Sequence, residues 1–495
     1  MKRTRKSGID ICQGFGLKGF SQEQIETLHD ASLEVLQNTG IKVESKDAAE
    51  IFLGAGADVE HVSNYFLVKI PPYLVEEAVS WAPRPGIFYG RVPEADFFAE
   101  PHRVGFATFG ECIQVIDPIT RKARKSTKKD CGEISLICDC FDEISVMERP
   151  CCSSDTHPET QPLHNFEAIV TNTSKPVFIA AVNGRNCTKM VEMAASCVGG
   201  RESFRKRPFL NIFVCPTSPL TLVKDCCEVI MEAAKLGAGI AIIPMALAGA
   251  TSPATVAGTL VTHNAEVLGA LVLAQLTVKG TRCVYCSVST IMDLKLMVSA
   301  VGAPEQGLIS AGAAKLAEYY RLPSWIGGGV SDSKIPDAQA AYEFAINALT
   351  GALTGANIVY GAGVLELGLT QDYAKLVMDI EAIKSIKKII GGVEICDETL
   401  ALDVIDQVGP GGEYLTHEHT YHYMREQSQP KLFDRRSRDA WQKSGGKDLT
   451  ERAYEQAVFI INNHKPIPLA QGSGEKMKEI IRGFEEELGV WEKEF

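Results

Sequence analysis

The run RCVYCS at residues 282–287, the stretch PEQGLISAGAAKLAEY at 304–319 and the run PSWIG at 323–327 decide the fold of this chain. The two short runs are almost entirely apolar, as are strands that are buried on both faces. The stretch between them has no internal proline and is long enough for a helix. Strand, helix and strand in this order form one unit of a parallel α/β architecture.

The same unit recurs on both sides of this segment. Candidate strands begin at intervals of roughly 30 to 42 residues, the length of a strand, a crossover helix and two loops. They lie at residues 104–109, 144–148, 177–182, 209–214, 240–244, 282–287, 323–327 and 357–361, and further helices are expected at 226–236 and 256–276. Eight units predict an α/β fold of the (β/α)8 TIM-barrel type rather than an open sheet. A doubly wound nucleotide-binding fold is disfavoured, because no GxGxxG follows the first strand.

The segments on either side of the predicted barrel do not show the alternating pattern of strands and helices. Ser21 and Gln24 form a capping box for a helix that Gly40 ends, and short β-like runs follow at 41–43 and 66–70. We therefore divide the chain into an N-terminal α/β extension that covers one end of the barrel (1–100), the barrel core (101–365) and a mainly helical C-terminal extension (366–495).

Composition excludes several function classes. The 495 residues carry a net charge of −12, which argues against nucleic acid as a partner, since that partner requires a basic face. The basic start, Met1 to Gly8, has no apolar segment after it, and no uncharged apolar run is long enough to span a membrane. The 15 cysteines are scattered and odd in number, which favours reduced thiols. We expect a cytoplasmic enzyme that acts on a small molecule.

Barrel enzymes carry their chemistry at the C-terminal ends of the strands. Those positions hold aromatic residues (Phe109, Trp325, Tyr360), carboxylates (Glu111, Asp332, Glu366) and hydroxyls (Ser287, Ser289, Thr290) but few histidines or lysines. A site lined by these residues suits an organic cation that is held by ring faces and a carboxylate. The alternative for each aromatic residue is the barrel core. The run Gly327-Gly328-Gly329 indicates positive φ or the close approach of a large ligand.

Metal sites are weakly indicated. His417, His419 and His422 form the one cluster that resembles zinc ligands, but the cluster lies outside the predicted barrel, so we assign no metal to the chain. His263 falls within an apolar helix and is interpreted as a core histidine. Asp155-Thr156-His157 lacks the glycine of the cobalamin-binding D-x-H-x-x-G loop, because position 160 is Thr160.

Several long strings resemble one family. They are LHDASLEVL near the start, CPTSPL (215–220), SPATVAGTLVTHNAEVL (252–268), GLISAGAAKLA (307–317), SDSKIPDAQA (331–340), ANIVYGAGVLELG (356–368) and LFDR (432–435). Over about residues 15–490 the chain is similar to the trimethylamine:corrinoid methyltransferases. In the trimethylamine enzyme, pyrrolysine precedes the Ser-Asp of the SDxK string; Val330 stands there in this chain. Members of the family without pyrrolysine include enzymes for glycine betaine, proline betaine and carnitine.

The resemblance implies transfer of a methyl group from a quaternary amine, with glycine betaine first, to the Co(I) centre of a corrinoid that a separate protein carries. No corrinoid is expected to bind tightly to this chain, and no catalytic side chain is assigned. We expect Phe109, Trp325 and Tyr360 with Glu111 to hold the ammonium group, and Glu366 to line the substrate site. The hydroxyls of Ser287, Ser289 and Thr290 are expected to receive a betaine carboxylate. Val330 is expected to line the substrate site, with Gly328, Gly329 and Asp332 facing the corrinoid.

Two alternatives remain open. One is a zinc-dependent corrinoid methyltransferase that uses the histidine cluster or Cys215, and the other is a catalytically idle protein that binds a betaine or acts as a scaffold. A homo-oligomer is expected, since symmetric assemblies are common among enzymes of this kind.

Overall fold

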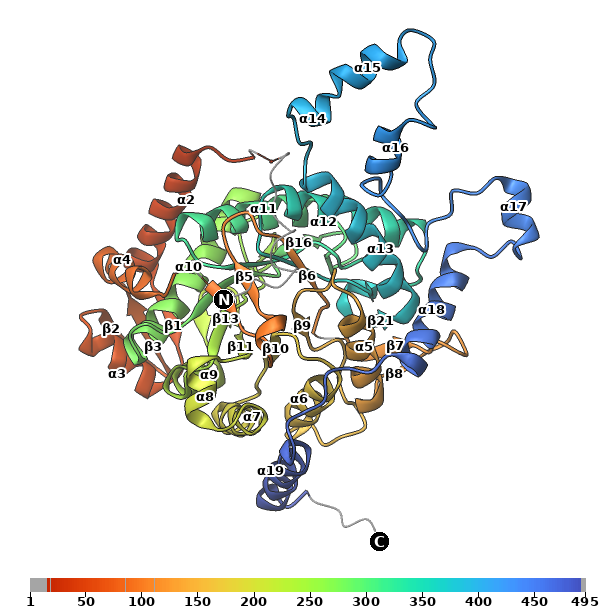
Figure 1. Ribbon diagram of the computed structural model, residues 1–495. Coiled ribbons are helices and arrows are strands. Elements are labelled where there is room, and N and C mark those ends of the chain that lie inside the picture. Colours follow the sequence, from red (N-terminus) through yellow and green to blue (C-terminus); the bar gives the residue numbers. More distant parts are fainter. Residues whose placement is uncertain (1–15, 18, 85, 111, 491–495) are drawn as a thin grey trace.

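A closed barrel of eight parallel strands lies at the centre of the molecule, with helices around it (Figure 1). The computed structural model describes residues 16–17, 19–84, 86–110 and 112–490. The barrel strands are β6 (Gly105–Ala107), β9 (Met147–Glu148), β10 (Val177–Ala180), β11 (Leu210–Val214), β13 (Gly239–Ile242), β15 (Cys283–Ser287), β18 (Ser324–Gly327) and β19 (Ile358–Tyr360). Each falls within or overlaps a strand expected from the sequence, so the predicted TIM barrel is confirmed.

The sheet closes on itself through its first strand. Phe106 in β6 pairs in parallel with Val359 of β19 and forms a parallel bridge with Ile144, just before β9. From β9 to β19, each barrel strand pairs in parallel with the next barrel strand along the chain. The sheet therefore has no free edge, and its strands are buried on both faces, which explains their nearly continuous apolar sequences.

One main helix follows each strand. These helices are α5 (Lys128–Cys140), α6 (Gln161–Asn172), α7 (Gly184–Cys197), α9 (Lys224–Leu236), α10 (Val256–Thr277), α11 (Pro304–Tyr319), α12 (Ala338–Leu353) and α13 (Tyr373–Ile390), with the short α8 (Arg201–Lys206) after α7. The helices expected at 226–236, 256–276 and 304–319 correspond to α9, α10 and α11. Helix α13, which completes the eighth unit, lies after residue 365.

The first helix begins and ends as its sequence indicates. Helix α2 (Gln22–Glu34) starts at a capping box, in which the Gln24 backbone N–H donates to Ser21 Oγ at 3.2 Å and the Ser21 N–H donates to Gln24 Oε1 at 2.8 Å. A π-helical turn, η1 (Val35–Thr39), continues it. Gly40 ends the segment with φ 79°, a backbone conformation that favours glycine.

The N-terminal segment packs on the side of the barrel. It contains β1 (Ile41–Val43), α3 (Lys46–Gly54), β2 (Asp58–Val62), β3 (Tyr65–Lys69) and α4 (Pro72–Trp81). Its sheet has the order β12-β1-β3-β2, where β12 (Thr221–Leu222) comes from the loop after barrel strand β11. Helices α2, α3 and α4 contact α10, so this segment is joined to both a barrel loop and a barrel helix.

A short hairpin covers the N-terminal end of the barrel. It consists of β4 (Gly86–Phe88), η2 (Pro93–Ala95) and β5 (Phe97–Ala99). The ring of Phe88 lies 5.0 Å from that of Phe178, near the start of β10. A side-chain carbon on Gly105, the first residue of β6, would lie 2.8 Å from the ring of Phe97. Because both contacts involve strand starts, the hairpin fills the end of the barrel opposite to the expected site.

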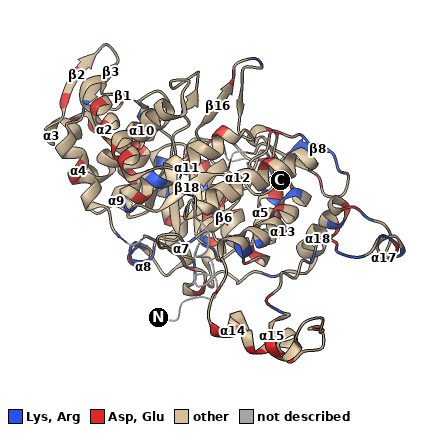
Figure 2. Ribbon diagram, turned by 90° about the horizontal axis from the view of Figure 1, so that it is seen from above, with Lys and Arg blue, Asp and Glu red and all other residues tan. Residues whose placement is uncertain are grey.

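Two small sheets are built from loops at the C-terminal ends of the barrel strands. One joins β20 (Val364–Leu365), β21 (Thr370–Asp372), β7 (Gln114–Ile116) and β8 (Ala123–Lys125), with the turn η3 (Glu366–Gly368) between the first two. The other joins β14 (Leu247–Ala248), β16 (Thr290–Asp293) and β17 (Val298–Ala300). Figure 2 shows the β16 hairpin standing clear of the barrel helices. These loops shape the mouth of the barrel.

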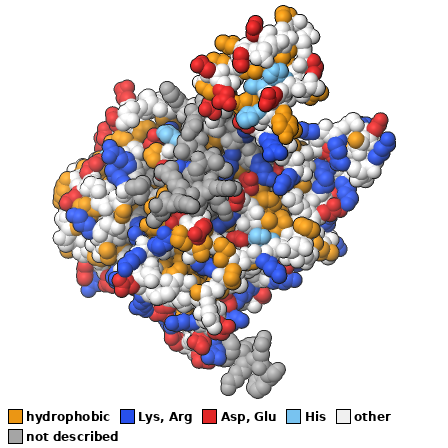
Figure 3. Space-filling view, in the orientation of Figure 1, with side chains coloured by type: hydrophobic (Ala, Val, Ile, Leu, Met, Phe, Trp, Pro, Cys, Tyr) orange, Lys and Arg blue, Asp and Glu red, His pale blue; other side chains and the backbone are white. Residues whose placement is uncertain are grey.

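The remaining C-terminal helices form two groups. Helices α18 (Leu449–Asn463) and α19 (Ser473–Leu488) pack on the barrel, against α13 and α5 and against α7 and α6 respectively. Helices α14 (Asp397–Leu400), α15 (Leu402–Val408) and α16 (Glu418–Tyr423) form an arm, residues 393–424, that projects from the barrel (Figures 1 and 3). Helix α17 (Arg438–Lys443) lies at the tip of a second, smaller projection.

Helix α10 is, among the described residues, the one helix that is long and apolar enough to cross a membrane by length and composition. Most of that helix is buried within the molecule, where it contacts α2, α4, α9 and α11. His263, Asn264 and Glu266 also lie on it and are buried. It is a core helix of the barrel wall.

The structure gives a packing reason for Gly328. A side-chain carbon there would lie 2.6 Å from Val359 Cγ1 and 3.1 Å from the Asn347 carbonyl oxygen. We therefore expect Gly328→Ala to lower the free energy of unfolding by about 1–3 kcal/mol, as overpacked core substitutions do. Differential scanning calorimetry should show a lower unfolding temperature.

Gly483→Ala is the matched control. Gly483 lies in the middle of α19 with no atom within 4 Å of the position of an added carbon, so the same substitution should leave stability unchanged or raise it slightly. An unfolding temperature of Gly328→Ala at or above that of the wild type would contradict the packing role.

Candidate functional site

A column of aromatic rings fills the interior of the barrel below its C-terminal mouth. The rings of Phe109 and Tyr360 are stacked with centroids 5.4 Å apart, and Tyr360 stacks on Trp325 at 6.3 Å. Trp325 also lies 4.3 Å from Phe178 and meets Phe213 edge-on at 5.4 Å. Trp325 and Tyr360 are fully buried, whereas Phe109, at the top of the column, is partly exposed. The expected aromatic residues are thus together in one column that reaches the mouth.

Glu148 places a carboxylate beside this column. It is the last residue of β9 and is 4% exposed. Burial raises the pKa of the Tyr360 phenol, and the charge of Glu148 is the next largest cause. The pKa of the buried Cys286 thiol is raised in the same way, first by burial and then by Glu148. A side-chain carbon on Gly110, the residue after Phe109, would lie 2.6 Å from Glu148 Oε1, so the carboxylate lies beside the upper end of the column.

Glu148 was not among the residues expected at the site. Residue 148 falls within a predicted strand, whereas the carboxylates expected at the site are those that follow strands. A charged residue at the end of an otherwise apolar, buried strand was the available signal, since such residues are rarely buried without a role. Glu111, the carboxylate that we expected to hold the ammonium group, lies outside the described residues.

The expected hydroxyls are turned toward the protein backbone. Ser289 Oγ accepts from the Ala246 N–H at 3.0 Å and lies 3.1 Å from His263 Nδ1. Thr290 Oγ1 donates to the Ala300 carbonyl at 2.5 Å. Ser287 Oγ lies 3.4 Å from the Ser289 backbone nitrogen. The Ser289 contact holds the loops after β13 and β15 together. Binding of a carboxylate by these hydroxyls stays a prediction.

The triple glycine is buried against protein atoms. A side-chain carbon on Gly329 would lie 2.7 Å from the backbone of Gly361, and one on Gly328 would meet Val359. Val330 is 2% exposed. The glycines therefore let β18 and the segment after it lie close to β19 and α12. A role for Gly328 and Gly329 in facing the corrinoid stays a prediction.

Asp332 connects two neighbouring loops, and Glu366 stabilises the turn that contains it. Asp332 Oδ1 accepts from the Val301 N–H at 3.0 Å, and burial is the largest cause that raises its pKa. Glu366 accepts from the Thr370 hydroxyl at 2.7 Å and has φ 55°. Both carboxylates are only partly exposed, and each has a structural partner.

A buried ion pair lies behind the segment that contains Val330. Lys375 Nζ is 2.6 Å from Asp379 Oδ2 and donates to the Gly329 carbonyl at 3.4 Å. Asp379 also accepts from the Gly363 N–H at 2.8 Å. Burial raises the pKa of Asp379 to about 6, against the opposing effect of Lys375. One charge pair thus fixes the segments after both β18 and β19.

A second buried carboxylate holds the loop after β11. Glu266, in α10, accepts from the Ser218 hydroxyl and from the Leu220 N–H, both at 2.8 Å. Burial raises its pKa to about 7. His263, one turn earlier, is fully buried, and burial lowers its pKa to about 3, so its ring is neutral. The interpretation of His263 as a core histidine is confirmed.

The histidine cluster does not converge. His417, His419 and His422 lie on the projecting arm, and His417 Nδ1 accepts from the backbone N–H of His419 at 3.1 Å. Within residues 16–17, 19–84, 86–110 and 112–490, no three His, Cys, Asp or Glu side chains are grouped so that they could hold a metal ion.

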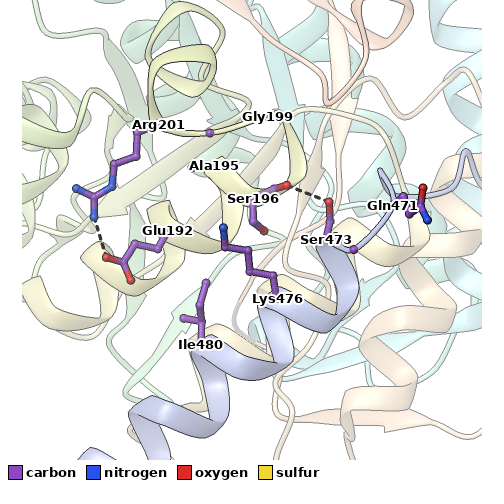
Figure 4. Close-up of a pocket in the computed structure, with 11 residues that line it drawn as sticks. Glu192, Ala195, Ser196, Gly199, Arg201, Gln471, Ser473, Lys476 and Ile480 are labelled. Atoms are coloured by element: carbon purple, nitrogen blue, oxygen red, sulfur yellow. Dashed lines mark hydrogen bonds and ion pairs between the residues drawn. The ribbon is translucent and has the colours of Figure 1, made fainter.

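A cavity of about 600 Å³ lies on the outside of the barrel, between the end of α7 and α19 (Figure 4). Arg201 in its wall forms an ion pair with Glu192 at 2.8 Å, and Ser473 donates to the Ser196 carbonyl at 2.9 Å. It marks where the last helix docks, away from the strand ends. The mouth of the barrel remains the stronger candidate for the active site.

The fold and this site together define a class of protein. A closed parallel barrel, plugged at its N-terminal end and lined at its C-terminal mouth by aromatic rings and a carboxylate, is a TIM-barrel enzyme for a small molecule.

Comparison with known proteins gives the family. The model of the trimethylamine methyltransferase family, MTTB, matches residues 13–489. The chain is 48% identical to a trimethylamine methyltransferase MttB of Desulfitobacterium hafniense over 485 residues, which cover 98% of this chain and 97% of the relative. It is 29% identical to a glycine betaine methyltransferase of the same species, covering 95% and 97% of the two chains. The chain belongs to the trimethylamine methyltransferase family and is a methyltransferase, as its sequence strings predicted.

A solved structure agrees on the fold. The hydroxylamine complex of MtmB is 11% identical and superimposes with a TM-score of 0.50, covering 93% of this chain and 95% of that one.

The raised pKa of Glu266 predicts a pH dependence of stability. The folded protein holds this proton up to about pH 7, whereas an exposed glutamate loses it near 4.5. Between these values the folded state binds more protons than the unfolded state, so the free energy of unfolding falls as pH rises. Glu266→Gln, which is neutral throughout, should remove up to about 3 kcal/mol of that fall between pH 5 and pH 8.

Urea unfolding at the two pH values measures this difference. Glu479→Gln, an exposed substitution on α19, should follow the wild type. Equal pH dependence in Glu266→Gln and the wild type would show that Glu266 is already ionised in the folded protein at pH 5.

Proposed function

We propose that this enzyme transfers a methyl group from a quaternary amine, with glycine betaine as the first candidate, to the Co(I) centre of a corrinoid carried by a separate protein. The observation that carries the proposal is the aromatic column with Glu148 beside it. Ring faces attract organic cations, by about 0.5–2 kcal/mol per ring, and a buried carboxylate supplies the matching charge.

The charge on the substrate supports this choice. When the C–N bond of a quaternary ammonium breaks, the electron pair stays on nitrogen and a neutral tertiary amine leaves, so no proton has to be supplied. The reduced corrinoid supplies the electron pair that forms the new bond to the methyl carbon. The task of this chain is then to position the methyl group, exclude water and match a charge that spreads as the bond breaks.

The strength of the cage matters for the rate. Rings and a carboxylate that enclosed the cation too tightly would stabilise the bound substrate more than the transition state. Phe109 is partly exposed at the top of the column, above the buried Tyr360 and Trp325. We infer that the ammonium group contacts the upper rings and that its transferable methyl group points toward the mouth.

The rim of the mouth suits a corrinoid protein. Cys215 lies exposed directly after β11 and Met245 lies exposed three residues after the end of β13, and Val182, after β10, is 49% exposed. The hairpin of β16 and β17 carries Leu294 and Leu296, which are 62% and 72% exposed. Exposed apolar residues around a mouth are typical of a docking surface. We propose that they receive the partner that carries the corrinoid.

Trimethylamine is a second candidate, favoured by the 48% identity to a trimethylamine methyltransferase MttB. Trimethylamine must be protonated for its nitrogen to leave as a neutral secondary amine, and the sequence resemblance places pyrrolysine in such enzymes where this chain has the buried Val330. The two candidates therefore differ in whether a proton must be held near nitrogen.

The assembly and location of the protein also stay proposals. The projecting arm carries strongly exposed apolar residues, among them Val393, Ile395 and Leu415 at 75%, 76% and 81% (Figure 3). Such a surface fits the expected homo-oligomer. A cytoplasmic location remains an expectation from the sequence.

Methyl transfer to reduced corrinoid protein tests the proposed function. Glycine betaine, proline betaine, carnitine, choline and trimethylamine should be offered separately and methylcobalamin followed by its visible spectrum. We expect methylation from one quaternary amine and none from trimethylamine. Turnover of trimethylamine alone would establish the second candidate, and a chelator-sensitive reaction with stoichiometric zinc would favour the zinc-dependent alternative.

Glu148→Gln tests the site itself. Loss of the carboxylate beside the rings should raise the KM for the quaternary amine by roughly 10- to 100-fold, equivalent to about 1.4–2.7 kcal/mol. The exposed substitution Glu479→Gln serves as the control. An unchanged KM in Glu148→Gln, with the protein folded, would remove Glu148 from the cation site.

A further inference from the structure

Gln306 reaches the inner face of the barrel from the mouth. It is the third residue of α11, which begins soon after the β16–β17 hairpin, and it is fully buried. Gly327, the last residue of β18, has no side chain, and a carbon added there would lie 3.1 Å from Gln306 Nε2 and 3.0 Å from the hydroxyl oxygen of Tyr360. The amide of Gln306 therefore lies beside the aromatic column, in space that Gly327 leaves open.

Neither polar atom of this amide has a hydrogen-bond partner among the described residues. Buried amides are nearly always paired, because an unpaired one loses its bonds to water without replacement.

Two other buried glutamines of this chain follow the rule. Gln275 donates to the Thr281 carbonyl at 2.8 Å and accepts from the Gly280 N–H at 2.9 Å. Gln371 donates to the Ala362 carbonyl at 3.3 Å. Gln306 differs from both in its lack of partners.

A second polar group in the same region is also unpaired. Trp325 lies two residues before Gly327 on β18, and its indole N–H has no partner among the described residues. The hydroxyl of Tyr360, by contrast, donates to the Ser287 carbonyl at 3.3 Å. Two N–H donors are thus left without acceptors next to rings that suit a cation. A ligand that carries both a cation and a hydrogen-bond acceptor would complete this arrangement.

We propose that the amide of Gln306 binds the carboxylate end of a zwitterionic quaternary amine and thereby sets the preference of the enzyme for betaines over simple ammonium ions. This inference rests on the proposed function and names the residue that recognises the carboxylate of the substrate. Nε2 donates to the carboxylate, and Oε1 faces the positively polarised methyl groups. The hydroxyls of Ser289 and Thr290 already contact backbone atoms, so Gln306 is the better placed donor.

The first test is ligand binding to the full chain, which does not require turnover. Isothermal titration calorimetry compares glycine betaine with tetramethylammonium, which has the cation but no acceptor. Gln306→Leu should weaken glycine betaine binding by about 10- to 100-fold and change tetramethylammonium binding by less than about threefold, because a site built to hydrogen-bond a ligand discriminates by that bond. Gln306→Glu should weaken betaine binding further and strengthen tetramethylammonium binding through its charge.

Thermal unfolding of the ligand-free proteins separates binding from structure. Replacing an unpaired buried amide by an apolar side chain of similar size should leave the unfolding temperature unchanged or raise it. The matched control is Gln275→Leu, which removes a paired amide and should lower the unfolding temperature without changing the preference between the two ligands.

Three results would overturn the inference. In the first, wild-type protein fails to bind glycine betaine at tens of millimolar. In the second, Gln306→Leu weakens the binding of both ligands equally. In the third, Gln306→Leu unfolds at a clearly lower temperature than the wild type. Selective loss of betaine binding in Gln306→Leu, together with no methyl transfer from betaine to a corrinoid protein, would uphold the inference and reject the proposed function.

Discussion

The closure of the parallel barrel is the constraint on which the rest of the structure depends. Phe106 pairs with Val359 on one side and bridges to Ile144 on the other, so the sheet has no edge and every strand ends on the same face. Closure also encloses a narrow interior that side chains must fill. The hairpin of β4 and β5 covers the strand starts, which leaves the opposite face as the entrance.

Filling that interior explains much of the sequence near the site. The aromatic side chains need space inside the barrel, and glycine, which has no side chain, leaves that space on the strands beside them. Gly327 leaves space for Tyr360 and Gln306, while Gly328 and Gly329 let β18 and its following segment approach β19 and α12. Adjacent glycines thus serve two kinds of packing, one around side chains inside the barrel and one between backbone segments.

Buried polar groups around the mouth fall into two kinds. Those with partners, such as Glu266 and the pair of Lys375 and Asp379, fix the loops after β11, β18 and β19. The amide of Gln306 lacks such partners and lies where a small molecule would enter. A site of the first kind is rigid without ligand, and a site of the second kind is completed by it.

The sequence by itself determined the eight strands, the capping box at Ser21, the core role of His263 and the family. These features depend on local periodicity, on residue spacing or on long strings, and all three are readable along one chain. Only the tertiary structure decided which side chains are neighbours in space. Glu148 and Gln306 are ordinary residues of a strand and a helix in the sequence, and they become neighbours of Tyr360 because closure brings β9, β15 and β19 around one interior. Ser289, Thr290 and Gly328 occupy strand ends as expected, but the direction of their contacts depends on loops distant in sequence, which no local pattern encodes.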